Sequence, residues 1–163
     1  MADPMSHGAI EIRPATPVDV EEISAVVLRC LRETNAHYYA ADVMASVIEN
    51  FSPAKIAARF ADRLVLVATA GRAIIGTASL HGAWVRSVFV RPDWQKRGVG
   101  TGLIRAIEER ADAQGLRQIS VPSSINAEEF YRRLGFMHLR DEFHGQERVI
   151  VMIKSLASPA EQG

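Results

Sequence analysis

One segment, residues 88–114, constrains the fold of this chain more than any other. It begins with the apolar run Val88-Phe89-Val90, passes through a loop that contains Gly98 and Gly100, and ends in apolar residues spaced three and four apart. The run predicts a buried strand, and the later spacing predicts an amphipathic helix from Val99 to Gln114. A strand, a glycine-containing turn and a helix in this order are typical of a crossover to a parallel strand.

The remaining pattern predicts a mostly antiparallel sheet around that crossover. Residues 33–52 show no clean period and predict an irregular cap. The expected strands are 10–13, 63–70, 73–80, 84–90, 119–121, 136–143 and 148–153, and the expected helices are 16–31, 53–60, 99–114 and 123–134. The fold class is therefore α/β (α+β): a mixed, mostly antiparallel sheet of about six to seven strands with a central parallel pair, flanked by helices.

The bulk composition allows one globular core. With 163 residues, 48% of them hydrophobic and 23% charged, we expect a single domain at 9–156 with flexible tails at 1–8 and 157–163. No apolar run approaches the ~20 residues that span a bilayer, and the start of the chain lacks the pattern of a signal peptide. We therefore expect a cytoplasmic protein with no membrane partner.

Charge and cysteine content argue against several classes of function. Nineteen basic and nineteen acidic residues cancel, so no long-range field attracts nucleic acid, and we expect no nucleic-acid partner. Cys30 is the one cysteine of the sequence, which excludes an intrachain disulfide and a multi-cysteine metal site. We expect Cys30 to be a buried structural thiol and expect no metal.

The loop at residues 95–101 has the composition of an anion site. Its glycines let the backbone approach a ligand closely, and they lie at a helix N-terminus, where unpaired amides and the helix dipole favour an anion. Gln95 and Thr101 add neutral hydrogen-bonding groups, while Lys96 and Arg97 add positive charge. A pyrophosphate fits these properties.

Other interpretations of the loop stay open on the residues alone. The Walker pattern fails because no Gly-Lys-Ser/Thr closes the loop, and the third glycine of a dinucleotide fingerprint would fall at Leu103. A nucleotide-binding domain would thus rest only on the glycines. A basic strand-to-helix turn without any ligand is the remaining alternative.

Two motifs resemble landmarks of one family. Residues 88–100 read VFVRPDWQKRGVG and resemble the acetyl-CoA signature of the GNAT superfamily of N-acetyltransferases. Residues 127–136 read AEEFYRRLGF and resemble the second landmark of that superfamily, at the correct distance. The order of strands and helices agrees as well, so the resemblance covers nearly the whole chain.

The resemblance implies an enzyme, an acyl-CoA-dependent N-acyltransferase. Such an enzyme would transfer an acetyl group from acetyl-CoA, its co-substrate, directly to a primary amine of a small molecule or peptide. A non-catalytic acyl-CoA-binding or regulatory module is the alternative. Homodimers are common in the superfamily, so a homodimer is a further expectation.

The same resemblance assigns a set of coenzyme contacts. In the family, the strand before the loop binds the pantetheine arm through its backbone, and the loop amides hold the pyrophosphate. Many members have an asparagine where this chain has Ser124, which either contacts the pantetheine arm or simply caps a helix. The implied coenzyme residues are Val88, Phe89, Val90, Gln95, Lys96, Arg97, Gly98, Val99, Gly100, Thr101 and Ser124.

The catalytic residues follow the family pattern only in part. A tyrosine at the position of Tyr131 commonly protonates the departing thiolate, and the pKa values of a phenol, ~10, and a thiol, ~8.5, permit this. Many members also carry an acidic base on the strand before the loop, but residues 84–90 contain none. His81 is our candidate for the base, with Glu142 and His144 as alternatives.

Recognition of the acceptor usually involves the variable early helices and the late hairpin of this superfamily. In this chain those regions include Arg32, His37, Tyr38, Tyr39 and Phe143. Aromatic and mixed charged residues fit a compact amine or a peptide terminus without choosing between them.

Overall fold

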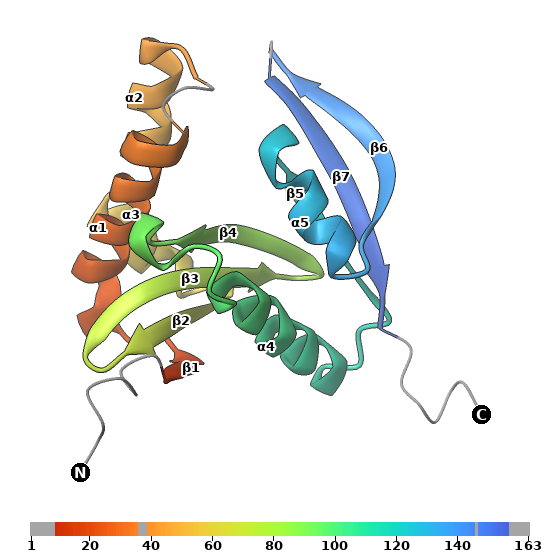
Figure 1. Ribbon diagram of the computed structural model, residues 1–163, viewed down its shortest axis with the longest axis horizontal. Helices are drawn as coiled ribbons and strands as arrows, with labels where there is room; N and C mark the ends of the chain where they lie inside the picture. Colours follow the sequence, from red (N-terminus) through yellow and green to blue (C-terminus); the bar gives the residue numbers. More distant parts are fainter. Residues whose placement is uncertain (1–8, 36–38, 146, 157–163) are drawn as a thin grey trace. The chain divides into compact units, whose positions relative to one another are not determined.

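A computed structural model describes residues 9–35, 39–145 and 147–156 (Figure 1). The predicted tails lie outside the described residues, and so do His37 and Tyr38. Within the described residues the strands form one seven-stranded sheet in the order β1-β2-β3-β4-β5-β7-β6. Their bounds are β1 Ile10–Pro14, β2 Leu64–Ala70, β3 Ala73–His81, β4 Trp84–Val90, β5 Gln118–Ser123, β6 Met137–His144 and β7 Glu147–Ser155.

The predicted fold class is confirmed, including the parallel pair. β4 pairs in parallel with β5 through Trp84 and Ser120, and the Ser120 N–H donates to the Ala83 carbonyl at 2.9 Å. The pairs β1–β2, β5–β7 and β6–β7 are antiparallel. The crossover expected after the apolar run at residues 88–90 therefore exists.

The helices agree with the sequence pattern except early in the chain and at 123–134, where Ser123 ends the preceding strand and a 3-10 turn, Ile125–Ala127, precedes the helix Glu128–Arg133. The predicted helix at 16–31 is a 3-10 turn, η2, followed by α1 and then by a short π-helix, η3. Residues 33–52 were expected to be irregular, and this expectation was wrong, because they contain α2. The bounds are η2 Pro17–Asp19, α1 Val20–Cys30, η3 Leu31–Asn35, α2 Ala41–Glu49, α3 Pro53–Arg59, η5 Pro92–Trp94, α4 Val99–Ala113, η6 Ile125–Ala127 and α5 Glu128–Arg133.

The described chain consists of two compact units: residues 9–79 with 87–104, and residues 80–86 with 105–156. In the first unit, α1 packs its apolar face against α3 and strands β2 and β3. Val20, Ile23 and Val27, at three- and four-residue steps, are buried there with Ile56 and Val65. The apolar stripe thus determines which face of α1 is covered.

The start of the helical segment is held by a buried carboxylate. Asp19 accepts two hydrogen bonds from Arg13, at 2.8 and 3.0 Å, and one from the Thr16 N–H at 2.8 Å. Thr16 and Asp19 also form a capping box. The hydrogen-bonded Arg13 guanidinium lowers the pKa of Asp19 to about 2. This ion pair connects β1 to the start of the helix.

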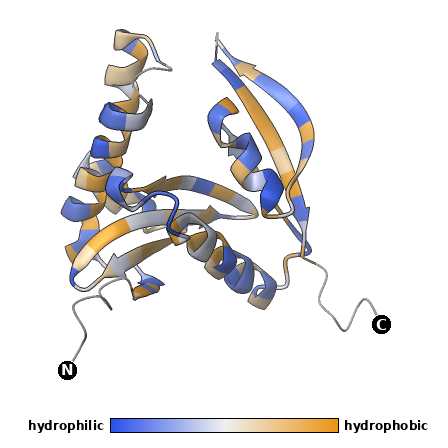
Figure 2. Ribbon diagram, viewed as in Figure 1, coloured by the Kyte–Doolittle hydropathy of each residue, from blue (hydrophilic) through white to orange (hydrophobic). Residues whose placement is uncertain are grey.

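In the second unit, β5, β7 and β6 form an antiparallel ladder beside α5. Figure 2 shows that the middle of β7 is mainly hydrophobic, and this middle, Val149 to Met152, is buried. Gly135 ends α5 at φ 98°, where the Phe136 N–H returns to the Tyr131 carbonyl at 3.1 Å. Lys154 donates to the Leu134 carbonyl at 2.6 Å, which fixes the same turn.

In the described ranges, no helix is both long enough and apolar enough to cross a membrane. The buried thiol expected from the sequence is confirmed, because Cys30 is buried and forms no disulfide. Burial raises the pKa of Cys30 to about 12, so the thiol stays protonated near neutral pH.

Candidate active site

The predicted anion loop leads directly into α4. The Gly98 carbonyl accepts the Gly102 N–H at 3.0 Å, so Gly98 precedes the first helical residue. The amides of Val99, Gly100 and Thr101 are therefore the first three of a 15-residue helix and have no preceding helical carbonyl to bind. Unpaired amides at a helix N-terminus, together with the helix dipole, favour an anion.

The backbone before α4 turns sharply to present these amides. Lys96 has φ 62° and Gly98 has φ 85°, both in the left-handed region. Such a conformation is unfavourable for lysine and free for glycine. Alternation of left-handed and other residues turns successive N–H groups toward one point, which is a known anion-binding arrangement.

A glycine in β3 allows α4 to approach the sheet. A Cβ atom on Gly76 would lie 3.0 Å from Val99 Cγ1, 3.1 Å from Leu103 Cδ1 and 3.2 Å from the Phe89 carbonyl oxygen. The first turn of α4 thus packs directly against the backbone of β3 at Gly76, with no side chain between them. Sequence reasoning missed this role, although a glycine inside a strand is a known signal of close approach.

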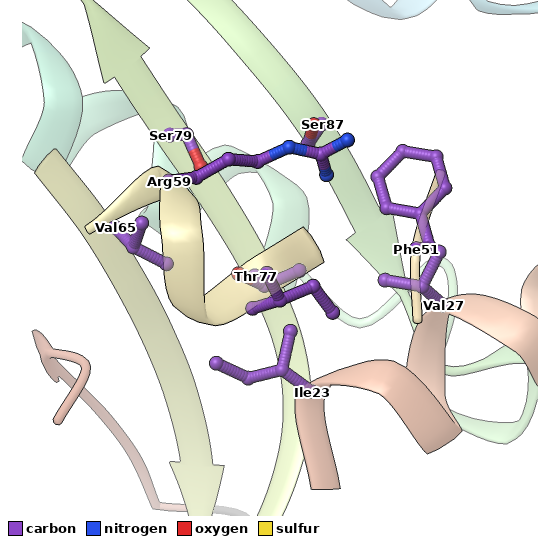
Figure 3. Close-up of a pocket in the computed structure, with 9 residues that line it drawn as sticks. Ile23, Val27, Phe51, Arg59, Val65, Thr77, Ser79 and Ser87 are labelled. Carbon is purple, nitrogen blue, oxygen red and sulfur yellow. The ribbon is translucent and has the colours of Figure 1, made fainter. Parts of the chain in front are cut away.

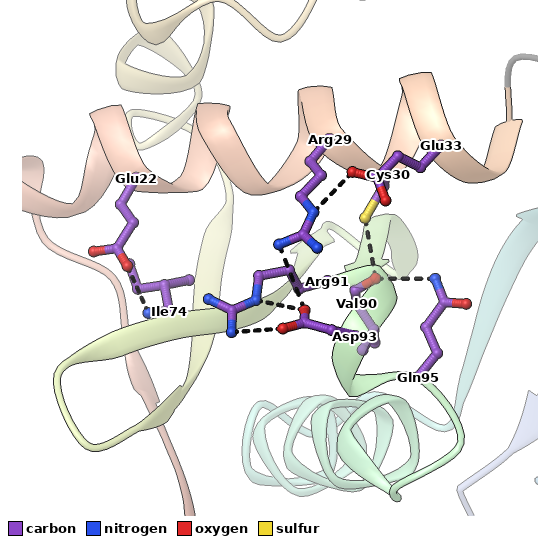
Figure 4. Close-up of polar contacts among 9 residues, drawn as sticks. All are labelled: Glu22, Arg29, Cys30, Glu33, Ile74, Val90, Arg91, Asp93 and Gln95. Carbon is purple, nitrogen blue, oxygen red and sulfur yellow. Dashed lines mark hydrogen bonds and ion pairs between the residues drawn. The ribbon is translucent and has the colours of Figure 1, made fainter.

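The polar side chains of the loop differ in what they contact. Gln95 Nε2 donates to the Val90 carbonyl at 3.1 Å, and the Cys30 thiol donates to the same oxygen at 3.0 Å (Figure 4). Gln95 therefore connects the loop to β4. Arg91 is engaged with Asp93 at 2.7 and 3.0 Å, which lowers the pKa of Asp93.

Arg97 is the loop arginine that remains available for a phosphate. Its guanidinium stacks over the buried Trp94 ring at 4.7 Å from the ring centre. Within the described residues it has no carboxylate partner. Stacking holds an arginine in place while leaving its N–H groups directed outward. Lys96 is exposed beside it.

A bulge in β4 decides which backbone groups face away from β3. The two-residue turn after His81 pairs that residue with Trp84. At the other end of the two strands, the Arg91 N–H donates to the Ile75 carbonyl at 2.8 Å. Between these two pairings β4 therefore contains one residue more than β3. The extra residue is Ser87, whose φ is 55°.

Because of that bulge, Val88 and Val90 direct their backbone groups to the edge opposite β3. Alternate residues of a strand use opposite edges, and Arg91 already bonds to β3. The Val90 carbonyl accepts the two hydrogen bonds described above, so its N–H is the group left for a ligand. Phe89 contributes differently: its ring packs edge-on against Phe51 at 5.3 Å.

A pocket of about 290 Å³, part of it open to solvent, lies in the same unit (Figure 3). Its walls are mainly apolar and come from α1, β2 and the segment 51–56, with Ile23 and Val27 among them. Its polar lining consists of Arg59, Thr77, Ser79 and Ser87. The sequence did not reveal this pocket, because its residues come from five separate segments.

Tyr131, the predicted acid, belongs to the second unit. Its side chain is 5% exposed and packs edge-on against Phe130 at 5.0 Å and Phe136 at 5.5 Å. In the described part of the chain no residue forms a hydrogen bond with its hydroxyl. Burial raises the pKa of Tyr131 above its ordinary value of 10, so the phenol remains a proton donor at neutral pH.

The other predicted residues of this unit occupy turns and the late hairpin. His81 is the last residue of β3, and Ser124 is the residue before η6, where its side chain forms no capping hydrogen bond. Glu142 accepts hydrogen bonds from Arg140 and His144, which lower its pKa and make it a weaker base.

A mixed sheet with one parallel pair, β4 and β5, whose strands are connected through a glycine-containing turn and α4, defines a class of α/β fold. The family model of the GNAT acetyltransferase domain matches residues 33–154. The chain therefore belongs to the GNAT family of acetyltransferases.

Individual relatives agree with that family. A crystal structure of a GCN5-related N-acetyltransferase from Rhodopseudomonas palustris is 30% identical, with a TM-score of 0.80 over 89% of this chain and 94% of that one. The PaiA N-acetyltransferase of Thermoplasma acidophilum, solved with coenzyme A, shares the fold at 22% identity, a TM-score of 0.78, and 90% and 99% coverage. The uncharacterised N-acetyltransferase YafP of Escherichia coli K12 is 23% identical over 82% of this chain and 85% of its own length.

Proposed function

We propose that this chain is an N-acetyltransferase that moves the acetyl group of acetyl-CoA directly to a primary amine. The observation that carries the proposal is the helix start at Val99, Gly100 and Thr101, with three free amides beside Arg97. These groups suit the pyrophosphate of a coenzyme. The backbone edge at Val88 and Val90 suits the amide-bearing pantetheine arm.

The proposed reaction is a direct displacement at the thioester carbonyl. The neutral amine nitrogen bonds to the acetyl carbon, the carbon–sulfur bond breaks, and coenzyme A leaves as a thiolate. The nitrogen loses one proton to a base, for which we propose His81, and the sulfur gains one from Tyr131. His81 then releases its proton to solvent and Tyr131 regains one from solvent, so the protons balance and both residues return to their starting state.

The chemistry of the phenol defines what Tyr131 can contribute. Its raised pKa exceeds the ~8.5 of a thiol, so complete proton transfer to free thiolate is uphill by about 1.4 kcal/mol per pKa unit. Tyr131 therefore first stabilises the negative charge on sulfur by a hydrogen bond, and the proton transfer is completed as solvent returns a proton to the phenol. The assignment is supported by the motif around residues 127–136 and by this protonation state.

The test is release of coenzyme A thiol from acetyl-CoA over a chemically diverse panel of amines. We expect turnover with at least one class, and Tyr131→Phe should lower kcat by about 10²- to 10⁴-fold, the usual contribution of a general acid. Binding of coenzyme A, measured by calorimetry, should persist in that variant. Equal kcat in Tyr131→Phe and the parent would remove Tyr131 from the mechanism, and His81→Ala tests the base in the same way.

A non-catalytic coenzyme-binding module is the second candidate. It is favoured by one observation, the absence of an acidic residue from the β4 sequence at 84–90. This candidate predicts tight coenzyme A binding and no thiol release with any amine. The amine panel therefore distinguishes the two functions.

A further inference from the structure

The pocket beside β4 contains a cation, Arg59, that forms no ion pair with a carboxylate of the described residues. Arg59 is half-buried at the end of α3 and extends across the pocket (Figure 3). Its Nη2 donates to the Asn50 carbonyl at 2.5 Å, and its guanidinium stacks on Phe51 at 4.8 Å from the ring centre. Among the residues that the structure describes, no carboxylate forms an ion pair with it.

This arrangement is electrostatically unfavourable in the empty pocket. Burial and, to a smaller extent, the nearby charge of Arg63 lower the pKa of Arg59, and the opposing attraction of Asp62 is the smallest of the three effects. A guanidinium carries five N–H donors, and the hydrogen bond to the Asn50 carbonyl uses one of them. An anion placed in the pocket would offset part of the cost of burying this charge and would accept hydrogen bonds from the remaining N–H groups.

Two serines supply further donors in the same place. Ser79 is only 4% exposed, lines the pocket, and within the described ranges has no hydrogen-bond partner for its hydroxyl. Ser87 is the bulge residue of β4, and a bulge redirects its side chain out of the regular alternation. Thr77 differs from both, because its hydroxyl already donates to the Leu66 carbonyl at 2.8 Å.

The position of the pocket along β4 connects it to the reaction. Ser87 immediately precedes Val88, where the backbone edge proposed for the pantetheine arm begins. A molecule held at Ser87 therefore lies beside the acyl end of that arm. This step rests on the proposed function.

We propose that this pocket binds the carboxylate of the acceptor, so that the substrate class is a small primary amine with a carboxylate group. Arg59 pairs with the carboxylate, Ser79 and Ser87 donate to it, and the apolar wall covers the aliphatic or aromatic part. The volume of about 290 Å³ includes open solvent, so the enclosed part accommodates the carboxylate end of the acceptor rather than the whole molecule. A polyamine or aminoglycoside would bring a second ammonium to Arg59 and be repelled.

The kinetic experiment compares amino acids with two analogues each: the amine that lacks the carboxylate and the neutral carboxamide. With the parent protein we expect kcat/KM to favour the amino acid over both analogues by about 10- to 100-fold, the range for a charge-assisted hydrogen bond. Dipeptides form a separate arm, which distinguishes a free amino acid from a peptide terminus as the source of the carboxylate.

The variants separate recognition from catalysis and folding. Arg59→Gln should raise KM for the amino acid by about 10- to 100-fold, with kcat and the KM for acetyl-CoA nearly unchanged, and Arg59→Lys should restore part of the affinity. Arg72→Gln, at an exposed arginine of the same unit, is the matched control and should change nothing. Equal preference for amino acid and carboxamide in the parent protein would overturn the proposal.

Calorimetry keeps the test independent of turnover. Binding of the amino acid to coenzyme-A-loaded protein, lost in Arg59→Gln, supports the pocket even if no amine is acetylated, an outcome that would refute only the proposed function. Absence of amino-acid binding to the loaded parent protein contradicts the pocket assignment. Thermal melts of the variants verify that each is folded.

Discussion

The structure predicts that one methyl group on Gly76 disturbs both stability and coenzyme binding. In Gly76→Ala the new Cβ would lie 3.2 Å from the Phe89 carbonyl oxygen, and 3.0 and 3.1 Å from Val99 and Leu103. The two side chains can shift by a few tenths of an ångström, but the backbone oxygen of β4 cannot move without the strand. Relief of all three contacts therefore shifts β4 relative to β3 and displaces the Val99 and Leu103 side chains at the start of α4.

The size of the effect follows from two opposed contributions. Overpacking of this kind destabilises the folded protein by about 1–3 kcal/mol. Replacing glycine also restricts the unfolded chain, which stabilises the folded protein by about 0.4–1 kcal/mol. We expect a net loss of about 1–2 kcal/mol, a fall in Tm of roughly 2–8 °C for a chain of this size. Because Val99 bears one of the anion-binding amides, the affinity for coenzyme A should fall as well.

Gly102→Ala is the matched control, because it adds the same methyl group to the same unit. Its Cβ would meet only the end of the Ile12 side chain, at 3.0 Å, and alanine is favoured over glycine inside a helix by about 1 kcal/mol. We expect this variant to be as stable as the parent or more stable. Denaturant titration and calorimetry with coenzyme A measure both variants, and a Gly76→Ala protein with unchanged stability and affinity would refute the reasoning.

Two further predictions concern charged groups. Asp19 has a folded pKa of about 2, below its ordinary value of 3.8, so its contribution to stability is present above pH 4 and is lost as the pH falls toward 2. Asp19→Asn should therefore lower the free energy of unfolding by about 2 kcal/mol at pH 7 and by much less at pH 2. Denaturant titration at each pH measures this difference, and a difference that does not change with pH would contradict the linkage. Arg97→Gln should weaken coenzyme A binding by about 10- to 100-fold at low salt, whereas Arg110→Gln, at an exposed site of α4, should not, and equal effects would remove Arg97 from the phosphate site.

The parts of the fold that sequence predicted are those with a strong local signal. The change from an apolar run to a helical stripe, with Gly98 between them, located the start of α4 at Val99 correctly. α2 was missed because its apolar residues follow a stretch without a period. Met44, Val47 and Ile48 do form a helical stripe, but they are only partly buried, so the contrast between its faces is weak.

The features that sequence could not provide depend on tertiary packing. Neither the bulge at Ser87 nor the stacking of Arg97 on Trp94 has a local pattern that distinguishes it from ordinary strand and loop residues. The pocket is a stronger case, because Val27, Arg59, Ser79 and Ser87 are far apart in the chain and only packing unites them. Sequence reasoning therefore found the predicted coenzyme loop and overlooked Arg59.

The charge of this pocket also bears on the departure of β4 from the family pattern. Many family members carry a carboxylate on this strand, whereas residues 84–90 have none and no acidic side chain lines the pocket. A carboxylate at Ser87 would pair with Arg59 and repel an acidic substrate. Its absence fits an acceptor that brings its own carboxylate, and it requires that the base come from outside this segment, as proposed for His81.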